Sequence, residues 1–486
     1  MLYPLPRSSM ATELPELRQH IARFLDLRTL KAFSLVCKAW YIDARPILWS
    51  HFKSRAPPKC SGSTGEYAHW LDTIRQNAIS FRHVYHDGFS PIAKDLHGIL
   101  MEQCHNSLIT MDVAISNFYW KSSLRPLIEQ NRISLRRLHM RLAADPSKMS
   151  LELPGLLTSL PQLRTLVLRV PEIMVEDLLS IMDACSSSLE YFDFQSNVRG
   201  RKDDQEGPVA YPIQLPAIIT GATATKAIFY PLKHLHIHGS CYNGALEDIL
   251  SRLAVRALEE FHVSTGSPFR MDLTLQNEFW GLTHLQLDRM RCSPNLVLSS
   301  ILNAIQPHQL RRVQLDNMNT ECTKKLIDQQ HQSLQSLNIR FMNGHGGLLA
   351  GILTTCSKLK SLIFITRPFA DMRTLIQPQK PWVCTELEEL DGNFGPTPLL
   401  LPSRPPPAYR LEFYRRNTGY LFMQRLVELK KLRRFVQRDN TAGHIGRRWT
   451  QKEIMRWSVD SDLKAPVQPR PPAKTKVSRK KPIWRP

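Results

Sequence analysis

The sequence predicts an α/β fold in which strands and helices alternate as a repeat solenoid behind a short N-terminal helical module. Three observations lead to this fold class. An apolar strand pattern recurs with a period near 26 residues over most of the 486-residue chain. Helical apolar spacing fills several of the intervals between copies. The first part of the chain instead carries three short amphipathic stripes. Because each repeat packs only on its neighbours, a chain of this length need not divide into separate globular cores.

The formal net charge of +21 lies mainly at the C-terminal end of the chain. Residues 404–486 hold 22 Lys and Arg against 6 Asp and Glu, which leaves +5 for the preceding 403 residues. A nucleic-acid-binding domain would spread basic side chains over a folded face. Contact with nucleic acid is therefore expected only from the basic tail.

The cysteines give no sign of a disulfide framework or a zinc knuckle. There are nine, an odd number, and none forms a Cys-x-x-Cys pair. No apolar stretch follows a basic region at the N-terminus, and no run approaches the roughly 20 apolar residues of a membrane span. We therefore expect a reducing setting, cytoplasmic and/or nuclear, with no membrane partner.

The helical module is predicted within residues 9–52. Its apolar residues form three stripes, which are Leu14, Leu17, Ile21, Phe24 and Leu25, then Leu27, Leu30, Phe33 and Val36, then Trp40, Ile47, Leu48 and Trp49. Three short helices cannot bury all of this surface by themselves. Part of it is expected to contact another protein.

These residues resemble the F-box, a motif with Leu-Pro at the start of a helix, a Leu-Val-Cys-x-x-Trp core and a closing Leu-Trp. The match covers about 40 residues, with Leu14 to Ile21 one residue shorter than usual. The resemblance implies docking on a Skp-family adaptor and its cullin scaffold. The residues implied to bind the adaptor are Leu14, Pro15, Leu17, Ile21, Leu30, Leu35, Val36, Cys37 and Trp40. An ordinary three-helix start to a globular domain is the alternative.

A Pro-, Gly- and Ser-rich linker is predicted at residues 53–66, and the solenoid at residues 67–395. The strand unit is Leu-x-x-Leu-x-Leu or a close apolar variant, a pattern and period typical of leucine-rich repeats. Clear copies begin at Leu135, Leu163, Leu189, Leu232, Leu258, Leu282, Leu310, Leu334 and Leu359, and weaker ones at Phe81, Leu108, Leu387 and Leu432. A long gap after Leu189 contains a polar insertion, Asn197–Pro208, that is expected to loop out.

Helices are predicted between the strand units. Val175, Leu246 and Leu298 each begin an apolar series at i, i+3, i+4 and i+7. Cys104, Cys185 and Cys356 lie three or four residues before the first Leu of a repeat, as in the cysteine-containing class of leucine-rich repeats. We expect these thiols to be small buried spacers.

The strand positions that alternate with the buried ones should form the recognition surface. Target-binding candidates on this face are Arg137, His139, Arg141, Arg169, Tyr191, His234, His236, His238, His262, His284 and Arg312. Five of the six histidines in this set, all except His139, fall on neighbouring strands. Alternating histidines can share a cation, but three in succession span roughly 13 Å, so only adjacent pairs could converge. We predict a solvated polar face without a metal or cofactor, and a pH-responsive or phosphate-attracting patch is the alternative.

The remaining C-terminal chain is predicted in three parts: a Pro-rich insertion at 396–408, a helical cap at 409–460 and a disordered basic tail at 461–486. The run Lys474–Lys481 fits either a nuclear-import signal or a solubilising tail. No Gly-rich phosphate loop, His-Glu-x-x-His or Gly-x-Ser-x-Gly is present. The chain is therefore not expected to be an enzyme.

Together these features predict a substrate-recognition subunit of a Skp–cullin–F-box ubiquitin ligase that binds an unknown protein target through its repeats. Two alternatives are kept. One is a leucine-rich-repeat scaffold without a ligase role, and the other is a nuclear nucleic-acid-associated protein that acts through its basic tail.

Overall fold

The computed structural model describes residues 14–54, 64–86, 93–115, 120–142, 152–185, 187–199, 232–239, 257–265, 279–288, 294–343, 347–367, 375, 381–393, 418–438 and 445–455. The chain forms two compact units, one of residues 1–344 with 361–368 and one of residues 345–360 with 369–486. None of the described helices is long and apolar enough to cross a bilayer.

The first unit begins with three helices, α1 (Pro15–Phe24), α2 (Leu27–Ser34) and α3 (Lys38–Leu48), which we call the helical module. α1 starts on a proline, which suits the first helical turn. The Asp26 carboxylate caps α2 by accepting from the backbone N–H of Thr29 at 2.8 Å. The three helices pack around Ala22, Leu30 and Ala44. The small core leaves much of the module's apolar surface unburied.

A buried ion pair joins the first and third helices of the module. The guanidinium of Arg18 on α1 donates to the carboxylate of Asp43 on α3, and both side chains are about nine-tenths buried. Gln19 also donates to Asp43, at 3.3 Å. This pair fixes how α1 lies on α3.

Strand β1 (His51–Lys53) follows α3 almost at once and pairs in parallel with β2 (His83–His86). The Phe52 ring stacks on Phe81 at 4.8 Å, and Arg45 donates to Asn77 at 2.7 Å. The sequence placed the first strand near Phe81 and a linker at 53–66. The structure instead puts Lys53 in the sheet, and helix α4 (Thr64–Asn77) begins within the predicted linker.

The sheet of the first unit contains β1 to β12, all parallel and ordered as in the chain. The strands after β2 are β3 (Thr110–Ile115), β4 (Arg137–Leu142), β5 (Thr165–Met174), β6 (Tyr191–Arg199), β7 (His234–Gly239), β8 (Glu260–Thr265), β9 (His284–Asp288), β10 (Arg312–Asp316), β11 (Ser336–Asn343) and β12 (Ser361–Arg367).

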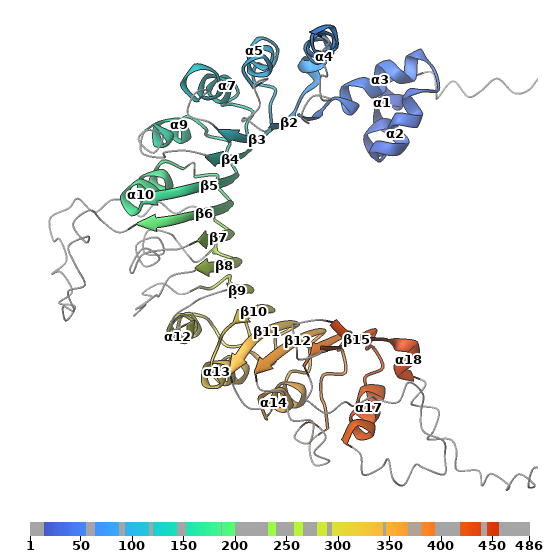
Figure 1. The fold of residues 1–486 in the computed structure, drawn as a ribbon, viewed down its shortest axis with the longest axis vertical. Coiled ribbons are helices and arrows are strands. Elements are labelled where there is room, and N and C mark those ends of the chain that lie inside the picture. Colours follow the sequence, from blue (N-terminus) through green and yellow to red (C-terminus); the bar gives the residue numbers. More distant parts are fainter. Residues whose placement is uncertain are drawn as a thin grey trace, which may run out of the picture. The chain divides into compact units, whose positions relative to one another are not determined.

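Helices cover one face of this sheet and leave the other uncovered, as Figure 1 shows. They are α4, the 3₁₀ turn η2 (Ala78–Ser80), α5 (Ala93–Gln103), the π turn η3 (Trp120–Leu124), α7 (Arg125–Gln130), α9 (Leu153–Thr158), α10 (Val175–Ala184), α12 (Pro294–Ala304) and α13 (Thr320–Gln330). We call the uncovered face of β1 to β12 the open face. This is an α/β solenoid of the leucine-rich-repeat kind, so the predicted fold class is confirmed at that level.

The strand units predicted from the apolar pattern are confirmed. In the nine clear copies, all three apolar side chains are at most 4% exposed. The weaker copies at Phe81, Leu108, Leu387 and Leu432 also lead into strands. The helix expected from Val175 is α10, and the one expected from Leu298 is α12.

Backbone bonds connect each repeat to the one before it. Two successive amides ahead of a strand donate to one carbonyl of the preceding repeat, as those of Arg136 and Arg137 do to Ile109 at 2.9 and 3.0 Å. The amides of Arg311 and Arg312 donate in the same way to Thr283 at 2.8 and 3.0 Å. We call this pair of bonds the amide fork. It uses no side-chain atoms.

The position three or four residues before the first Leu holds a buried side chain in several repeats, as predicted from the cysteines. Cys104, Cys185 and Cys356 are all buried. Burial raises the pKa of the Cys104 thiol to about 11 and that of Cys185 to about 12, so these thiols are protonated spacers. Asn131 and Gln330 occupy the same position and are fully buried. Their amides bind backbone N–H groups of the preceding repeat.

The second unit contains α14 (Gly347–Thr355), β13 (Glu389–Gly392), α17 (Thr418–Glu428), β14 (Arg434–Arg438), β15 (Ile445–Thr450) and α18 (Gln451–Met455). β14 pairs in parallel with β13 and antiparallel with β15. The region predicted as a helical cap, 409–460, therefore holds two strands as well as helices. β15 covers an edge of β14 that would otherwise present unpaired backbone groups.

Several predicted segments lie partly or wholly outside the described residues. These are the Pro-rich insertion at 396–408, the basic tail at 461–486 with its Lys474–Lys481 run, and the helix expected from Leu246. Of the insertion Asn197–Pro208, the first three residues belong to β6 and the rest lie outside the described residues.

Candidate functional site

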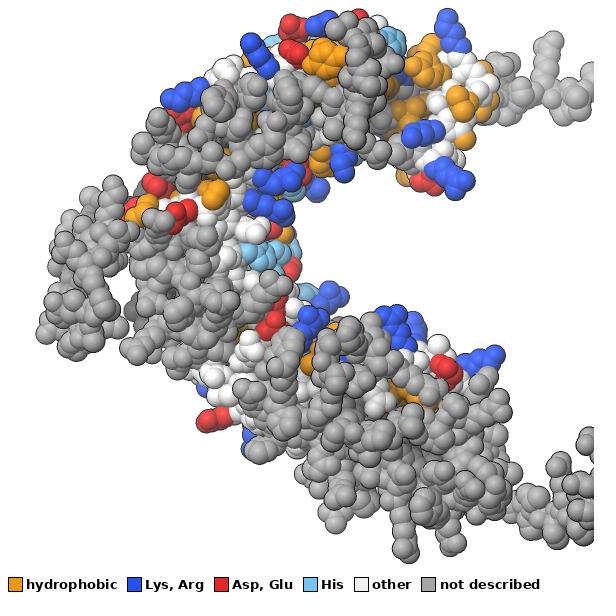
Figure 2. Space-filling view, in the orientation of Figure 1, with side chains coloured by type: hydrophobic (Ala, Val, Ile, Leu, Met, Phe, Trp, Pro, Cys, Tyr) orange, Lys and Arg blue, Asp and Glu red, His pale blue; other side chains and the backbone are white. Residues whose placement is uncertain are grey.

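The turn between α2 and α3 carries two strongly exposed apolar side chains of the helical module. Leu35 is 84% exposed and Val36 is 67% exposed, and Cys37 beside them is also exposed. Figure 2 shows hydrophobic side chains gathered on this part of the molecule. Leu14 and Pro15 at the start of α1 are exposed too. The structure thus presents these five predicted residues to solvent.

The other predicted adaptor-binding residues are less accessible. Leu17, Ile21 and Trp40 are half-buried, and the Trp40 ring packs edge-on against Phe33 with centroids 3.5 Å apart. Leu30 is only 2% exposed and belongs to the core of the module. Its assignment to the adaptor surface was therefore wrong, because α3 packs over that side of α2.

Three exposed apolar side chains of the module were not among the predicted site residues. They are Phe24, Tyr41 and Ile42. Phe24 lies within the first apolar stripe of the sequence, so its apolar character was visible. Its exposure follows from the way that α1 packs on α3, which periodicity alone does not reveal.

All eleven predicted target-binding residues lie on the open face. Arg137, His139 and Arg141 alternate along β4 with buried apolar residues, and none of the three is buried. His139 and Arg141 both approach the Asp112 carboxylate on β3, at 3.8 and 3.4 Å. The neighbouring His139 ring, with Arg141, helps to hold the pKa of Asp112 below its usual value. Arg169 on β5 lies beside Arg141, so this end of the face is basic.

The centre of the open face is a patch of histidines interleaved with carboxylates, over β6 to β9 (Figure 2). Parallel register places His234 beside Tyr191 and Glu260, and His236 beside Asp193 and His262. We call the histidines of this patch, with Tyr191, Asp193, Glu260 and Asp288, the histidine–carboxylate patch; the histidines are His234, His236, His238, His262 and His284.

Each carboxylate of the patch contacts a histidine. Glu260 lies 3.0 Å from His234 Nδ1 and 3.3 Å from His236 Nε2. Asp288 lies 3.2 Å from His262 Nε2, and Asp193 lies 3.7 Å from His238 Nε2. The sequence pattern did not predict these pairs, since they depend on residue-to-residue register between strands.

The contacts shift the acid–base behaviour of the patch. His236 and His234 lower the pKa of Glu260 to about 2. Burial, with Asp193 and Glu260 nearby, raises the pKa of Tyr191 to about 12. Burial and the neighbouring His262 lower the pKa of His238. Near neutral pH the patch therefore combines an ionised Glu260 with a neutral Tyr191 phenol and a neutral His238 ring.

A hydrogen-bonded chain of polar side chains runs from this patch across β9, β10 and β11. Arg340 donates to Asn338 at 3.1 Å, Asn338 donates to Gln314 at 3.0 Å, and Gln314 donates to Asp288 at 2.8 Å. Gln286 donates to the same carboxylate. The chain fixes the position of Asp288.

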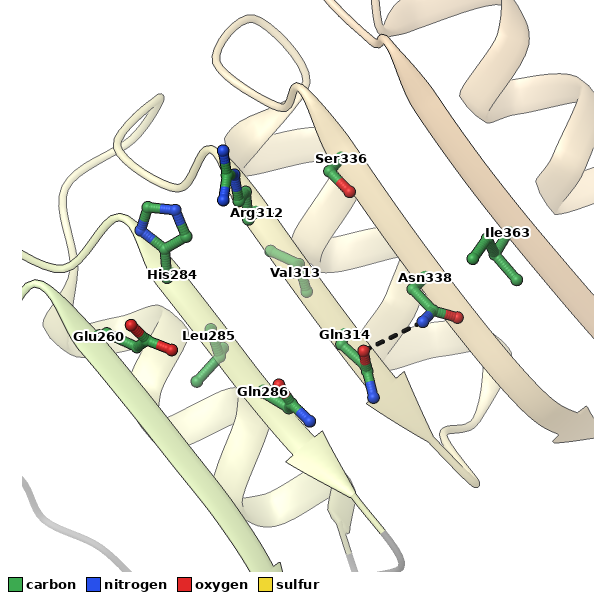
Figure 3. A pocket seen from close by; sticks show the side chains of 10 residues that line it. All are labelled: Glu260, His284, Leu285, Gln286, Arg312, Val313, Gln314, Ser336, Asn338 and Ile363. Atoms are coloured by element: carbon green, nitrogen blue, oxygen red, sulfur yellow. Dashed lines mark hydrogen bonds between the residues drawn. The ribbon is translucent and has the colours of Figure 1, made fainter. Parts of the chain in front are cut away.

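A shallow pocket lies on the open face over β8 to β12. Figure 3 shows His284, Arg312 and Ser336 along one row of the sheet and Gln286, Gln314 and Asn338 along the next. Burial and Arg312 lower the pKa of His284. The pocket offers hydrogen-bond donors and acceptors in rows that cross neighbouring strands.

Comparisons with known proteins add two solved structures of low similarity. Neither a family model nor a curated protein matches the chain. The yeast Rad7–Elc1 complex is similar at 11% identity with a TM-score of 0.37, over 79% of this chain and 89% of that one. The leucine-rich-repeat-containing protein LegL7 from Legionella pneumophila is similar at 11% identity with a TM-score of 0.30, over 65% of this chain and 91% of that one.

Proposed function

We propose that this chain is the substrate-recognition subunit of a Skp–cullin–F-box ubiquitin ligase. In this proposal the helical module docks on the Skp-family adaptor, and the open face holds a protein target. The chain performs no chemistry. It contributes proximity, which makes transfer of ubiquitin to the target effectively intramolecular.

The observation that carries the proposal is the exposed pair Leu35 and Val36 within a Leu-Val-Cys-x-x-Trp sequence. Exposure of such large apolar side chains to water is unfavourable. Burial of both against a partner would contribute about 3 kcal/mol to the free energy of binding. That amount corresponds to about a hundredfold in affinity. The neighbouring exposed residues Leu14, Tyr41 and Ile42 enlarge the apolar surface available for docking.

The open face supports the target-binding part of the proposal. On β4, β7 and β9 its side chains are polar or charged and partly exposed, while the apolar residues that alternate with them hold the solenoid together. Recognition can therefore use this face without disturbing the core. Its basic end at Arg137, Arg141 and Arg169 favours an acidic segment of the target.

The test is a pull-down of the full chain with a purified Skp-family adaptor. The double variant Leu35→Glu/Val36→Glu should reduce adaptor binding at least a hundredfold, because two carboxylates would be buried in an apolar interface. The control is Ile133→Glu, which places the same charge on an apolar side chain that is 61% exposed but lies outside the module. Ile133→Glu should bind like the unaltered chain.

Thermal unfolding of the unaltered chain, the double variant and Ile133→Glu shows whether a loss of adaptor binding is due to a loss of folding. Leu35 and Val36 lie at the surface, so the double variant should unfold at nearly the same temperature as the unaltered chain. Full adaptor binding by the double variant, or none by the unaltered chain, would reject the ligase role. The second outcome would favour a repeat scaffold with an N-terminal helical cap.

A further inference from the structure

Three histidines of the histidine–carboxylate patch converge on one point of the open face. His236 and His238 alternate along β7, and His262 lies directly opposite His236 on β8. One ring nitrogen from each of the three lies within 4.8 Å of the other two. The ring centroids of His238 and His262 are 4.5 Å apart, and those of His236 and His262 are 5.4 Å apart. His262 comes from the neighbouring strand β8, so the three rings can converge although three alternate residues of one strand could not.

The carboxylates beside the three rings orient them for coordination. Asp288 lies 3.2 Å from Nε2 of His262, and Asp193 lies 3.7 Å from Nε2 of His238. Both contacts are made by Nε2 and leave Nδ1 of each ring out of them. A carboxylate that accepts from one ring nitrogen leaves the lone pair of the other free, which is the arrangement found around histidine ligands of metals.

The remaining ring, that of His236, is held between two further groups of the patch, Tyr191 and Glu260. Its Nδ1 lies 3.2 Å from the Tyr191 hydroxyl, and its Nε2 lies 3.3 Å from Glu260. If the ring rotated, one of its nitrogens would leave its present contact and bind the ion instead. Because Glu260 also contacts His234, the carboxylate keeps a partner after such an exchange.

The charge of the patch also favours a cation. Asp193, Glu260 and Asp288 bring three carboxylates to three imidazoles, and neutral imidazole is the form that binds metal. Zinc bonds to histidine nitrogen at about 2.0–2.1 Å, which places tetrahedral ligands about 3.3 Å apart. The nitrogens would approach one another by up to about 1.5 Å, a shift within reach of side-chain rotation.

We propose that His236, His238 and His262 form a binding site for a divalent transition-metal ion of the Zn²⁺ class on the open face. The rings are partly exposed, so an ion can reach them from solvent. Water or a donor side chain of a bound protein completes the coordination there. This site is independent of adaptor docking, since it lies on β7 and β8 and not on the helical module.

The test is a competition titration of metal-free full-length protein with Zn²⁺ against a chromophoric chelator, under reducing conditions. The unaltered chain should bind about one ion at this site. His238→Gln and His262→Gln should each weaken binding at least tenfold, and Asp288→Asn should do so by about 10- to 100-fold through loss of ring orientation. His284→Gln is the matched control, because His284 lies on the same face one strand beyond His262.

Two further measurements keep the result interpretable. Zn²⁺ should raise the unfolding temperature of the unaltered chain and of His284→Gln, but not that of His262→Gln. Co²⁺ bound at the site should show ligand-field absorption without the strong thiolate charge-transfer bands of a cysteine site. Equal affinities of His238→Gln, His262→Gln and His284→Gln would overturn the proposal, and so would thiolate bands in the Co²⁺ spectrum.

Discussion

Replacement of Asn131 by alanine should destabilise the first unit strongly, although the residue belongs to neither proposed binding surface. The amide oxygen of Asn131 accepts from the backbone N–H groups of Ser107 and Leu108, both at 3.0 Å. Its amide nitrogen donates to the Leu127 carbonyl at 2.9 Å. Because the side chain is fully buried, water cannot replace it without a rearrangement.

The size of the effect follows from the groups left without partners. Each buried N–H that loses its acceptor costs about 1–3 kcal/mol, so Asn131→Ala should lose about 2–5 kcal/mol of unfolding free energy. That is a large fraction of the about 5–15 kcal/mol that stabilises a typical domain. The control is Asn303→Ala, which removes an exposed side chain that only accepts from Lys325 and should cost less than about 0.5 kcal/mol.

The assay is urea denaturation followed by circular dichroism, combined with amide hydrogen exchange. The midpoint for Asn131→Ala should fall, and exchange should accelerate in the peptide that contains Ser107 and Leu108. Exchange is informative here because a repeat stack can open locally without global unfolding. A loss below about 1 kcal/mol with unchanged exchange at these two amides would refute the reasoning.

Three further predictions concern other parts of the first unit. Burial and the neighbouring His86 lower the pKa of His97 to about 4, so the folded chain favours the neutral ring and the unfolded chain binds more protons below pH 6.5. Stability should therefore fall by about 3 kcal/mol as the pH drops from 6.5 to about 4, and urea midpoints of His97→Gln should show a smaller fall. Asp43→Ala should cost about 3–5 kcal/mol in thermal or urea unfolding, because it leaves the buried Arg18 guanidinium without its carboxylate. Gly239→Ala should cost about 2 kcal/mol or more, since φ is +117° and a Cβ would lie 1.9 Å from the Ser196 carbonyl oxygen.

Each of these predictions has an outcome that contradicts it. An unchanged pH dependence in His97→Gln would mean that other groups cause the acid destabilisation. The double variant Arg18→Met/Asp43→Leu should recover most of the stability lost by Asp43→Ala. If it does not, the buried charge of Arg18 is not the cause of the loss in Asp43→Ala. Gly239→Ala with an unchanged unfolding midpoint would show that the end of β7 can move away from Ser196.

The repeats could be predicted from the sequence because buried side chains recur at fixed positions. Two strands escaped this reasoning. β1 has three residues and one buried apolar side chain, Phe52, which is too little to stand out as a pattern. β15 pairs antiparallel, and its Ile445–Thr450 sequence has two adjacent arginines where alternation would be sought.

The candidate sites were predictable only as sets of residues. Leu30 and Leu35 belong to the same motif, yet one is core and the other is exposed, because helix packing decides between them. The five histidines were recognisable as one patch, but the pairing of His262 with Asp288 depends on register. Asn131 and Gln330 could have been found, since each lies four residues before the first Leu of a repeat, as Cys104 does.

The amide fork described above has a consequence for how such a chain can change over evolutionary time. Since successive repeats are joined through main-chain atoms, the junction tolerates changes of the outward-facing side chain on either side of it, except to proline, which has no N–H to donate. Substitutions at Arg137 or His284 can therefore change the chemistry of the open face while the scaffold stays intact. Duplication or loss of a whole repeat would regenerate the same junction, so the length of the binding surface can evolve independently of its chemistry.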